Sequence, residues 1–136
     1  MIVVDASCLT ALVAGSPADV DTAASVMAAD DHWVVPGHAI IETISALRGL
    51  YLGRVLTRDA MLDAAQQLAE FRLDVWPTEP LLGRVLELAD NASAYDAAYF
   101  ALAEELGVPL VSGDARLTRV PGVRCAVVTI AMSDSR

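Results

Sequence analysis

Short apolar runs alternate with longer stretches of helical spacing, and this alternation restricts the fold more than any other feature of the sequence. Five mostly apolar runs have the length of buried strands: residues 2–4, 32–35, 73–76, 109–111 and 125–130. Helical spacing or helix-start signals mark residues 18–29, 37–52, 57–71, 78–91 and 94–106. Strands that alternate with helices of ten or more residues form βαβ units. The sequence therefore predicts an α/β fold, a three-layer α/β/α sandwich with a mostly parallel sheet, as one domain over residues 1–136.

Four acidic residues lie where a carboxylate is unusual. Asp5 and Asp114 follow the first and fourth predicted strands, which can be neighbours in a parallel sheet, so both should lie at its carboxyl edge. Asp96 lies in the first turn of a very apolar helix, and Glu42 interrupts the apolar run 39–44. A buried carboxylate costs several kcal/mol unless it is paired or binds a metal. We therefore expect the four residues to cluster.

Each of these acids also has an ordinary structural explanation. Asp96 and Asp114 could cap helices, Asp5 could hold a turn, and Glu42 could pair with an arginine. Four clustered carboxylates, however, cannot all stay ionised without cations. Oxygen ligands without a set of Cys and His residues indicate Mg²⁺ or Mn²⁺, and such a site suits phosphodiester hydrolysis by metal-activated water.

The charge composition limits the chemistry further. The chain has 18 acidic and 9 basic residues, all nine of them arginine, and a formal net charge of −9. A broad basic face for nucleic acid is therefore excluded, and so are phosphate-binding loops and phosphatases that need a lysine. The apolar stretches are too short to span a membrane, and the two cysteines lack a CxxC or secretory spacing. We expect a soluble protein of the cytoplasm that makes no membrane contact.

Four segments of the sequence resemble PIN-domain proteins, specifically the VapC toxins of type II bacterial toxin–antitoxin pairs. The matching segments are residues 2–7, Pro36 with Glu42, residues 94–99 and residues 110–117, in the order and spacing of that family. The resemblance implies an α/β/α sandwich with Mg²⁺-dependent endoribonuclease activity.

The same resemblance assigns roles to individual residues. It implies the catalytic acids Asp5, Glu42, Asp96 and Asp114. The metal ligands would be Asp5, Asp96 and Asp114, with Glu42 acting through water. Ser7 matches a hydroxyl that orders the site, and Ser112 stands where threonine is more usual. Arg116, two residues after Asp114, is a candidate for contacting an RNA phosphate.

The resemblance further implies partners for the chain. These are an RNA substrate, a second copy in a homodimer, and a VapB-type antitoxin whose C-terminal segment lies in a groove over the active site. The apolar residues at the end of the 37–52 stretch suit a dimer contact or a groove for an amphipathic helix, but core packing would explain them equally well.

Several alternatives remain open at this stage. His38 and Glu42 have the spacing of metal ligands on a helix, although no third His or Cys completes such a site. The chain could be a non-enzymatic acidic module that binds a basic partner, or a metal-dependent phosphatase, although Ser7 stands where a haloacid-dehalogenase motif has its second aspartate. Most aromatic residues are expected in the core rather than on a base-stacking surface: Trp33, Trp76, Tyr95, Tyr99 and Phe100.

Overall fold

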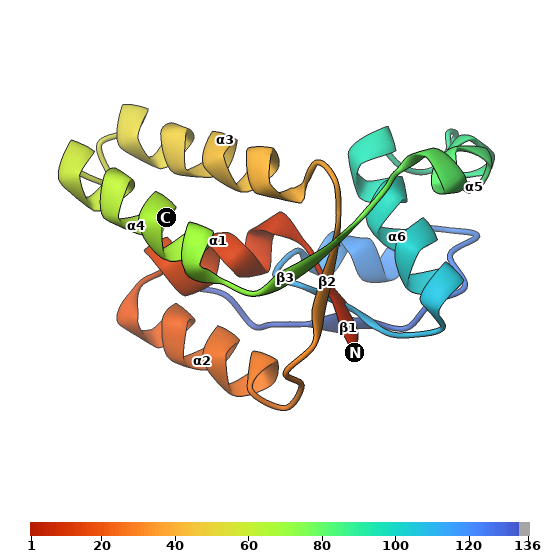
Figure 1. Ribbon diagram of the computed structural model, residues 1–136, viewed down its shortest axis with the longest axis horizontal. Coiled ribbons are helices and arrows are strands. Elements are labelled where there is room, and N and C mark those ends of the chain that lie inside the picture. Colours follow the sequence, from red (N-terminus) through yellow and green to blue (C-terminus); the bar gives the residue numbers. More distant parts are fainter. Residues whose placement is uncertain (134–136) are drawn as a thin grey trace.

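A five-stranded parallel sheet forms the centre of the computed structural model, which describes residues 1–133 (Figure 1). Its strands are β1 (Ile2–Val4), β2 (Trp33–Pro36), β3 (Leu73–Trp76), β4 (Leu110–Ser112) and β5 (Val127–Thr129). They lie in the order β3-β2-β1-β4-β5, and every neighbouring pair is parallel. The predictions of a parallel α/β sheet and of neighbouring first and fourth strands are therefore confirmed.

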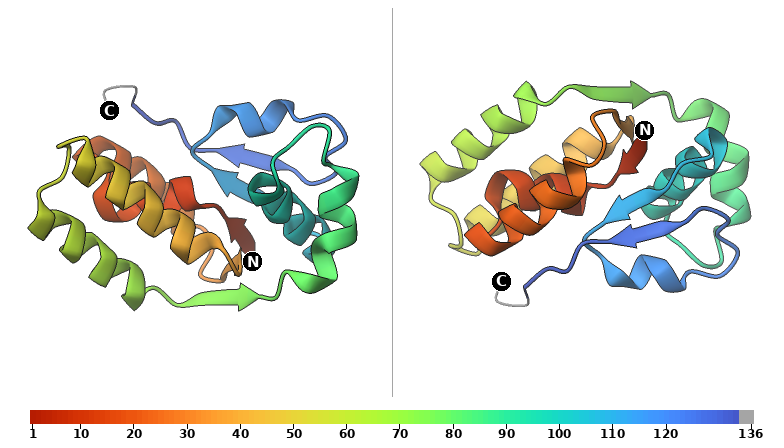
Figure 2. Two further views of the ribbon diagram at one scale, coloured as in Figure 1. Left: turned by 90° about the horizontal axis from the view of Figure 1, so that it is seen from above. Right: turned by 90° about the horizontal axis from the view of Figure 1, so that it is seen from below.

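One group of helices lies on each face of this sheet (Figures 1 and 2). One group contains α1 (Ala6–Ala14), α2 (Pro17–Met27), α3 (Ala39–Leu52) and α4 (Arg58–Glu70), and α1 packs against the other three. The other contains α5 (Leu82–Glu87) and α6 (Ala94–Leu106), and α6 packs on β1, β2 and β4. Single 3₁₀ turns cover Glu79–Leu81 and Ala115–Arg119. Within the described residues, no helix is both long and apolar enough to span a bilayer.

Two helical predictions need correction. Helix α1 was not predicted, and its start is set by Asp5, whose side chain accepts a hydrogen bond from the backbone N–H of Cys8 as an N-cap. The predicted helix over residues 78–91 is instead a 3₁₀ turn followed by the six-residue α5. Pro80 lacks an N–H to donate and Gly83 lowers helix propensity, so this stretch cannot sustain a long helix.

The core lies between the sheet and the two helix groups. Val3, Val4 and Val34 are fully buried on the central strands, and Tyr99 and Phe100 are buried on α6. The expectation that the aromatic residues lie in the core is therefore confirmed for those two rings, and Trp33 and Trp76 are partly buried. The same expectation is wrong for Tyr95, whose exposed fraction is 63%. The chain turns into α6 just before Tyr95, and this places the ring at the surface rather than under the sheet.

Gly107 ends α6 in a left-handed conformation, with φ +66° and ψ +36°. A Cβ at Gly107 would meet no atom within 4 Å, so Gly107→Ala should cost only backbone strain, about 1 kcal/mol, and lower Tm by about 3–4 °C.

Gly49 lies inside α3, where a Cβ would also meet nothing within 4 Å. Gly49→Ala should therefore raise Tm by a few degrees through helix propensity. Thermal unfolding should show a lower Tm for Gly107→Ala and a higher Tm for Gly49→Ala. Tm changes of the same sign and size would contradict these explanations.

Candidate active site

The Asp5 carboxylate is held between the ends of the two central strands. Its side chain follows β1 and is only 5% exposed. One carboxylate oxygen accepts hydrogen bonds from the Ser7 hydroxyl at 2.6 Å and the Cys8 N–H at 3.1 Å. The other accepts the Ser112 hydroxyl, from the end of β4, at 2.5 Å. Burial raises the pKa of Asp5, and these hydrogen bonds oppose that rise without cancelling it. Asp5 is thus a desolvated carboxylate in one fixed orientation.

Two serine hydroxyls connect Asp5 to the loop after β4. The fully buried Ser112 hydroxyl also accepts a hydrogen bond from the Asp114 N–H at 2.9 Å. The Ser7 hydroxyl accepts one from the Gly113 N–H at 2.7 Å. A Cβ on Gly113 would lie 3.1 Å from the Ser7 oxygen, so this close approach favours glycine. The hydroxyls that the sequence assigned to site ordering therefore lie directly against Asp5 and the 112–114 loop.

Asp114 lies near enough to Asp96 for its negative charge to act on the Asp96 carboxylate. Ser93 caps α6 by accepting a hydrogen bond from the Asp96 N–H, so Asp96 is not itself the cap. Burial raises the pKa of Asp96, and the negative charge of Asp114 raises it further. A cation between the two carboxylates would relieve this repulsion.

The Asp114 carboxylate is held by one residue, Arg116, through both its backbone and its side chain. Its carboxylate accepts a hydrogen bond from the Arg116 N–H at 3.0 Å and therefore caps the 3₁₀ turn Ala115–Arg119. The Arg116 guanidinium also donates to it at 2.7 Å, and these bonds lower the pKa of Asp114. The Arg116 side chain is 86% exposed, so this ion pair lies open to water and to ligands. The capping role considered for Asp114 is therefore real.

Glu42 pairs with a tyrosine and faces a histidine rather than an arginine. One carboxylate oxygen accepts the Tyr99 hydroxyl at 2.9 Å, and the other lies 4.0 Å from Nε2 of His38. Burial and the neighbouring Glu42 charge both raise the pKa of Tyr99, so its hydroxyl remains a proton donor. Tyr99 was assigned only to the core from the sequence. Its spacing of three residues from Asp96 on one helix was the available signal, because such residues share a face.

The four predicted acids are thus placed around the carboxyl ends of β1 and β4. Asp5 and Asp114 share the Ser112 hydroxyl, Asp96 lies near Asp114, and Tyr99 lies near both Glu42 and Asp5. Their oxygen donors suit Mg²⁺ or Mn²⁺. Over residues 1–133, however, no three His, Cys, Asp or Glu side chains stand close enough together to hold one ion. The donor chemistry fits a divalent cation, and binding one requires these side chains to converge.

A parallel sheet with this strand order, and with carboxylates at the carboxyl ends of its central strands, defines a PIN-like α/β protein. The model of the PIN domain family matches residues 2–123. Ribonuclease VapC12 of Mycobacterium tuberculosis is 30% identical over 131 residues, which cover 96% of this chain and all of the relative. Ribonuclease VapC9 of the same organism is 33% identical over 135 residues, covering 96% of this chain and 98% of the relative. The chain therefore belongs to the PIN domain family, and within it to the VapC group.

Solved structures agree with this fold. M. tuberculosis VapC20, described as a toxin that cleaves the sarcin-ricin loop, superposes with a TM-score of 0.68 at 21% identity, covering 91% of this chain and 97% of that one. A toxin–antitoxin complex from Klebsiella pneumoniae gives a TM-score of 0.66 at 15% identity, covering 98% of this chain and all of that one. At such identities the likeness supports the architecture alone.

Proposed function

We propose that this chain is a Mg²⁺- or Mn²⁺-dependent endoribonuclease, the toxin of a VapBC-type toxin–antitoxin pair in the cytoplasm. The observation that carries the proposal is the buried Asp5 carboxylate, fixed by Ser7 and Ser112 where the two central strands end. A buried acid with a raised pKa at the carboxyl ends of parallel strands is typical of a functional site. The relatives named ribonuclease VapC support RNA as the substrate.

The residues of the site would divide the work as follows. Asp5, Asp96 and Asp114 would hold the divalent ion, which supplies an activated water and neutralises charge on the scissile phosphate. The Tyr99 hydroxyl keeps Glu42 in one orientation, where its carboxylate can accept a proton from water. Because the Arg116 guanidinium is exposed, it can release the Asp114 carboxylate and bind an RNA phosphate in its place. The local arginine would then compensate for the absence of a broad basic face.

The antitoxin and the homodimer belong to the same proposal. Structures that superpose on this chain include VapBC2 from Rickettsia felis bound to a DNA fragment from the promoter. Helix α3 exposes Ile41, Ile44 and Leu52, with exposed fractions of 72%, 37% and 57%, whereas Leu47 is buried in the core. This exposed apolar face suits an amphipathic partner helix or a second copy of the chain.

RNA cleavage with and without metal tests the proposal. The purified chain is incubated with a mixed RNA substrate in Mg²⁺ or Mn²⁺, with and without EDTA, alongside Asp5→Asn. We expect cleavage only in the wild type with metal. Cleavage that survives both EDTA and Asp5→Asn would contradict the mechanism. Hydrolysis of a phosphate monoester without RNA cleavage would favour a phosphatase, and no hydrolysis of either substrate would favour an acidic binding module.

Ser112→Ala should lower RNA cleavage because it removes the hydroxyl that Asp5 and the Asp114 N–H share. Loss of a residue that orients a metal ligand costs about 10–100-fold, and we expect that range in kcat. Ser112→Thr keeps the hydroxyl and should retain most of the activity. Steady-state cleavage rates of both variants test this role, and equal losses would show that residue 112 acts through packing alone.

Asp96→Asn should weaken Mn²⁺ binding by at least about tenfold, because it removes one anionic ligand. It also removes the repulsion between Asp96 and Asp114, so the metal-free variant should be at least as stable as the wild type. Titration calorimetry with Mn²⁺ and thermal unfolding in EDTA measure the two effects. Asp90→Asn, at an exposed position before α6, serves as the control. Unchanged Mn²⁺ affinity in Asp96→Asn would contradict the ligand assignment.

A further inference from the structure

An exposed aromatic ring stands next to the acidic site. Tyr95 directly precedes Asp96 in the first turn of α6, and its exposed fraction is 63%. Ile41, in the first turn of α3, is 72% exposed. Both side chains line a cavity of about 300 Å³, together with His38, Glu42 and Ser45. Glu42 therefore belongs both to this cavity and to the proposed catalytic acids.

Three rings form a row that leads from the core to this cavity. The buried Tyr99 ring lies 4.9 Å from the half-buried His38 ring, at an interplanar angle of 60°. The His38 ring lies 5.7 Å from the exposed Tyr95 ring, at 52°. Nε2 of His38 is buried on the Glu42 side of its ring and has no hydrogen-bond partner in the part of the chain that the structure describes. The inner end of the row is fixed by packing, and its outer end is free to contact a ligand.

The lining of the cavity selects for a neutral, flat group. Among the described residues that line it, Glu42 supplies a carboxylate, and Asp96 follows Tyr95 directly, so a phosphate would be repelled here. An aromatic ring and an aliphatic side chain instead offer stacking and apolar contact, which every nucleobase accepts. Pockets of ~300 Å³ lie at the small end of ligand sites, a size that suits a single base.

We propose that Tyr95, His38 and Ile41 form a subsite that binds one base of the RNA beside the cleaved bond. The Tyr95 ring stacks on the base, and Ile41 contacts its edge. The Ser45 hydroxyl and the Glu42 carboxylate can accept hydrogen bonds from an exocyclic amino group, so the subsite favours adenine, guanine or cytosine over uracil. The inference rests on the proposed function, because the acidic site fixes where the phosphate lies and the subsite reads the neighbouring base.

Sequencing of cleavage sites in a randomised oligoribonucleotide library tests the subsite directly. The wild type should show a preference for an amino-bearing base at one position next to the cut. Tyr95→Ala removes the ring that holds the base against Ser45 and Glu42, so it should reduce that preference on the order of tenfold and leave preferences at other positions unchanged. Tyr95→Phe keeps the ring and should behave like the wild type, and Ile41→Ala should show a smaller loss. Leu86→Ala removes another side chain that is 72% exposed, on α5, and is the matched control.

A second substrate separates base binding from general damage to the site. An oligoribonucleotide of the preferred sequence is compared with the same oligonucleotide carrying an abasic residue at the selected position. The abasic change should raise KM on the order of tenfold for the wild type, with little change in kcat, and should have almost no effect on Tyr95→Ala. Thermal unfolding should show equal stability for Tyr95→Ala and Leu86→Ala.

The outcomes distinguish the two proposals. A wild type that cleaves no RNA overturns the proposed function and the subsite with it. Cleavage that depends on metal but shows the same base preference in the wild type and Tyr95→Ala overturns the subsite alone. An equal abasic effect in the wild type and Tyr95→Ala also overturns the subsite, because the base would then be recognised elsewhere.

Discussion

Asp5→Asn should lower kcat/KM for RNA cleavage by at least about 10³-fold without unfolding the chain. Asp5 would help to hold an ion that would stabilise transition-state charge by several kcal/mol, and each ~1.4 kcal/mol corresponds to tenfold in rate. Asparagine keeps the shape of the side chain. Its oxygen can still accept from Ser7 and the Cys8 N–H, and its amide can donate to Ser112 in place of the bond that Asp5 accepts. The loss would therefore report on charge rather than on the hydrogen-bond network.

Stability and a control substitution complete this experiment. Burial raises the pKa of Asp5, so the ionised carboxylate costs folding energy that asparagine does not. In EDTA at neutral pH, Asp5→Asn should be at least as stable as the wild type. Asp63→Asn, on the exposed face of α4, should change neither activity nor stability. A drop in activity accompanied by an equal loss of folded protein would assign Asp5 a structural role instead.

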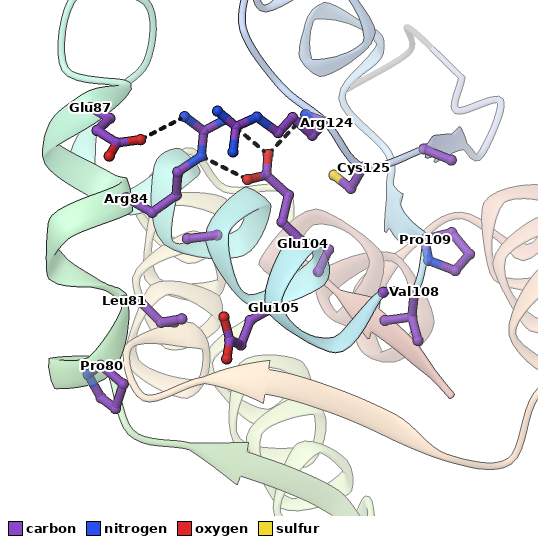
Figure 3. A pocket seen from close by; sticks show the side chains of 14 residues that line it. Pro80, Leu81, Arg84, Glu87, Glu104, Glu105, Val108, Pro109, Arg124 and Cys125 are labelled. Atoms are coloured by element: carbon purple, nitrogen blue, oxygen red, sulfur yellow. Dashed lines mark hydrogen bonds and ion pairs between the residues drawn. The ribbon is translucent and has the colours of Figure 1, made fainter.

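Glu104→Ala should destabilise the fold by about 2–3 kcal/mol, or about 6–10 °C in Tm, although Glu104 lies outside the site. Glu104 and Arg84 have side chains only 11% and 19% exposed, and Arg84 donates to Glu104 through Nε at 2.7 Å. Glu104 also accepts the Arg124 N–H at 2.8 Å, and Arg84 donates to the Gly122 carbonyl at 2.6 Å. Figure 3 shows this pair in the pocket where α5, α6 and the loop before β5 meet. Alanine would leave Arg84 without its main partner.

The pH dependence of this effect follows from the pKa of Glu104. Burial alone would raise it, but hydrogen bonds from Arg84 and from the Arg124 backbone outweigh burial and hold it below the ordinary value of 4.5. Because the folded-state pKa is lowered, the stabilisation is complete above pH 4.5 and is lost as the pH falls through the folded-state value. Denaturant unfolding should therefore show a gap between wild type and Glu104→Ala at pH 7 that narrows in acid.

Glu105→Ala is the matched control for this ion pair. Glu105 is the next residue on α6 and is exposed. Within residues 1–133 it forms no ion pair. We expect its Tm to stay within about 2 °C of the wild type. Glu104→Ala should also retain normal RNA cleavage at temperatures where it is folded, since Glu104 and Asp96 lie two turns apart at opposite ends of α6. Equal Tm values for the two variants would show that the pair contributes nothing.

Apolar runs and strand ends made much of the fold and site predictable. The runs that became β1 and β4 are short, fully buried and followed at once by polar residues, so Asp5 and Asp114 could be placed at one edge from the sequence. Helix α1 escaped prediction because its nine residues include buried positions on several sides rather than a clear apolar stripe. The best sequence signal for the start of α1 was Asp5, a favoured N-cap residue, but Asp5 was interpreted only as a turn residue or a metal ligand.

Contacts between distant parts of the chain account for what the sequence did not reveal. Tyr99 donates to Glu42 across 57 positions, and no local pattern specifies which partner a tyrosine hydroxyl finds. The exposure of Tyr95 depends on how α6 packs on the sheet, so the expectation of a core position failed. The Arg116–Asp114 pair is local, yet its open position follows from the tertiary placement of the turn after β4.

The central place of β1 in the sheet has a consequence for synthesis of the chain. Strand β1 is synthesised well before its neighbour β4, and Asp5 meets the Ser112 hydroxyl across 107 positions. Such long-range pairing is slow to form, because the loop must close before the contact stabilises it. A nascent chain that ends before β4 lacks Asp96's neighbour Asp114 and the hydroxyl that orients Asp5. The proposed nuclease would therefore stay inert until β4 and the loop that follows it have been synthesised.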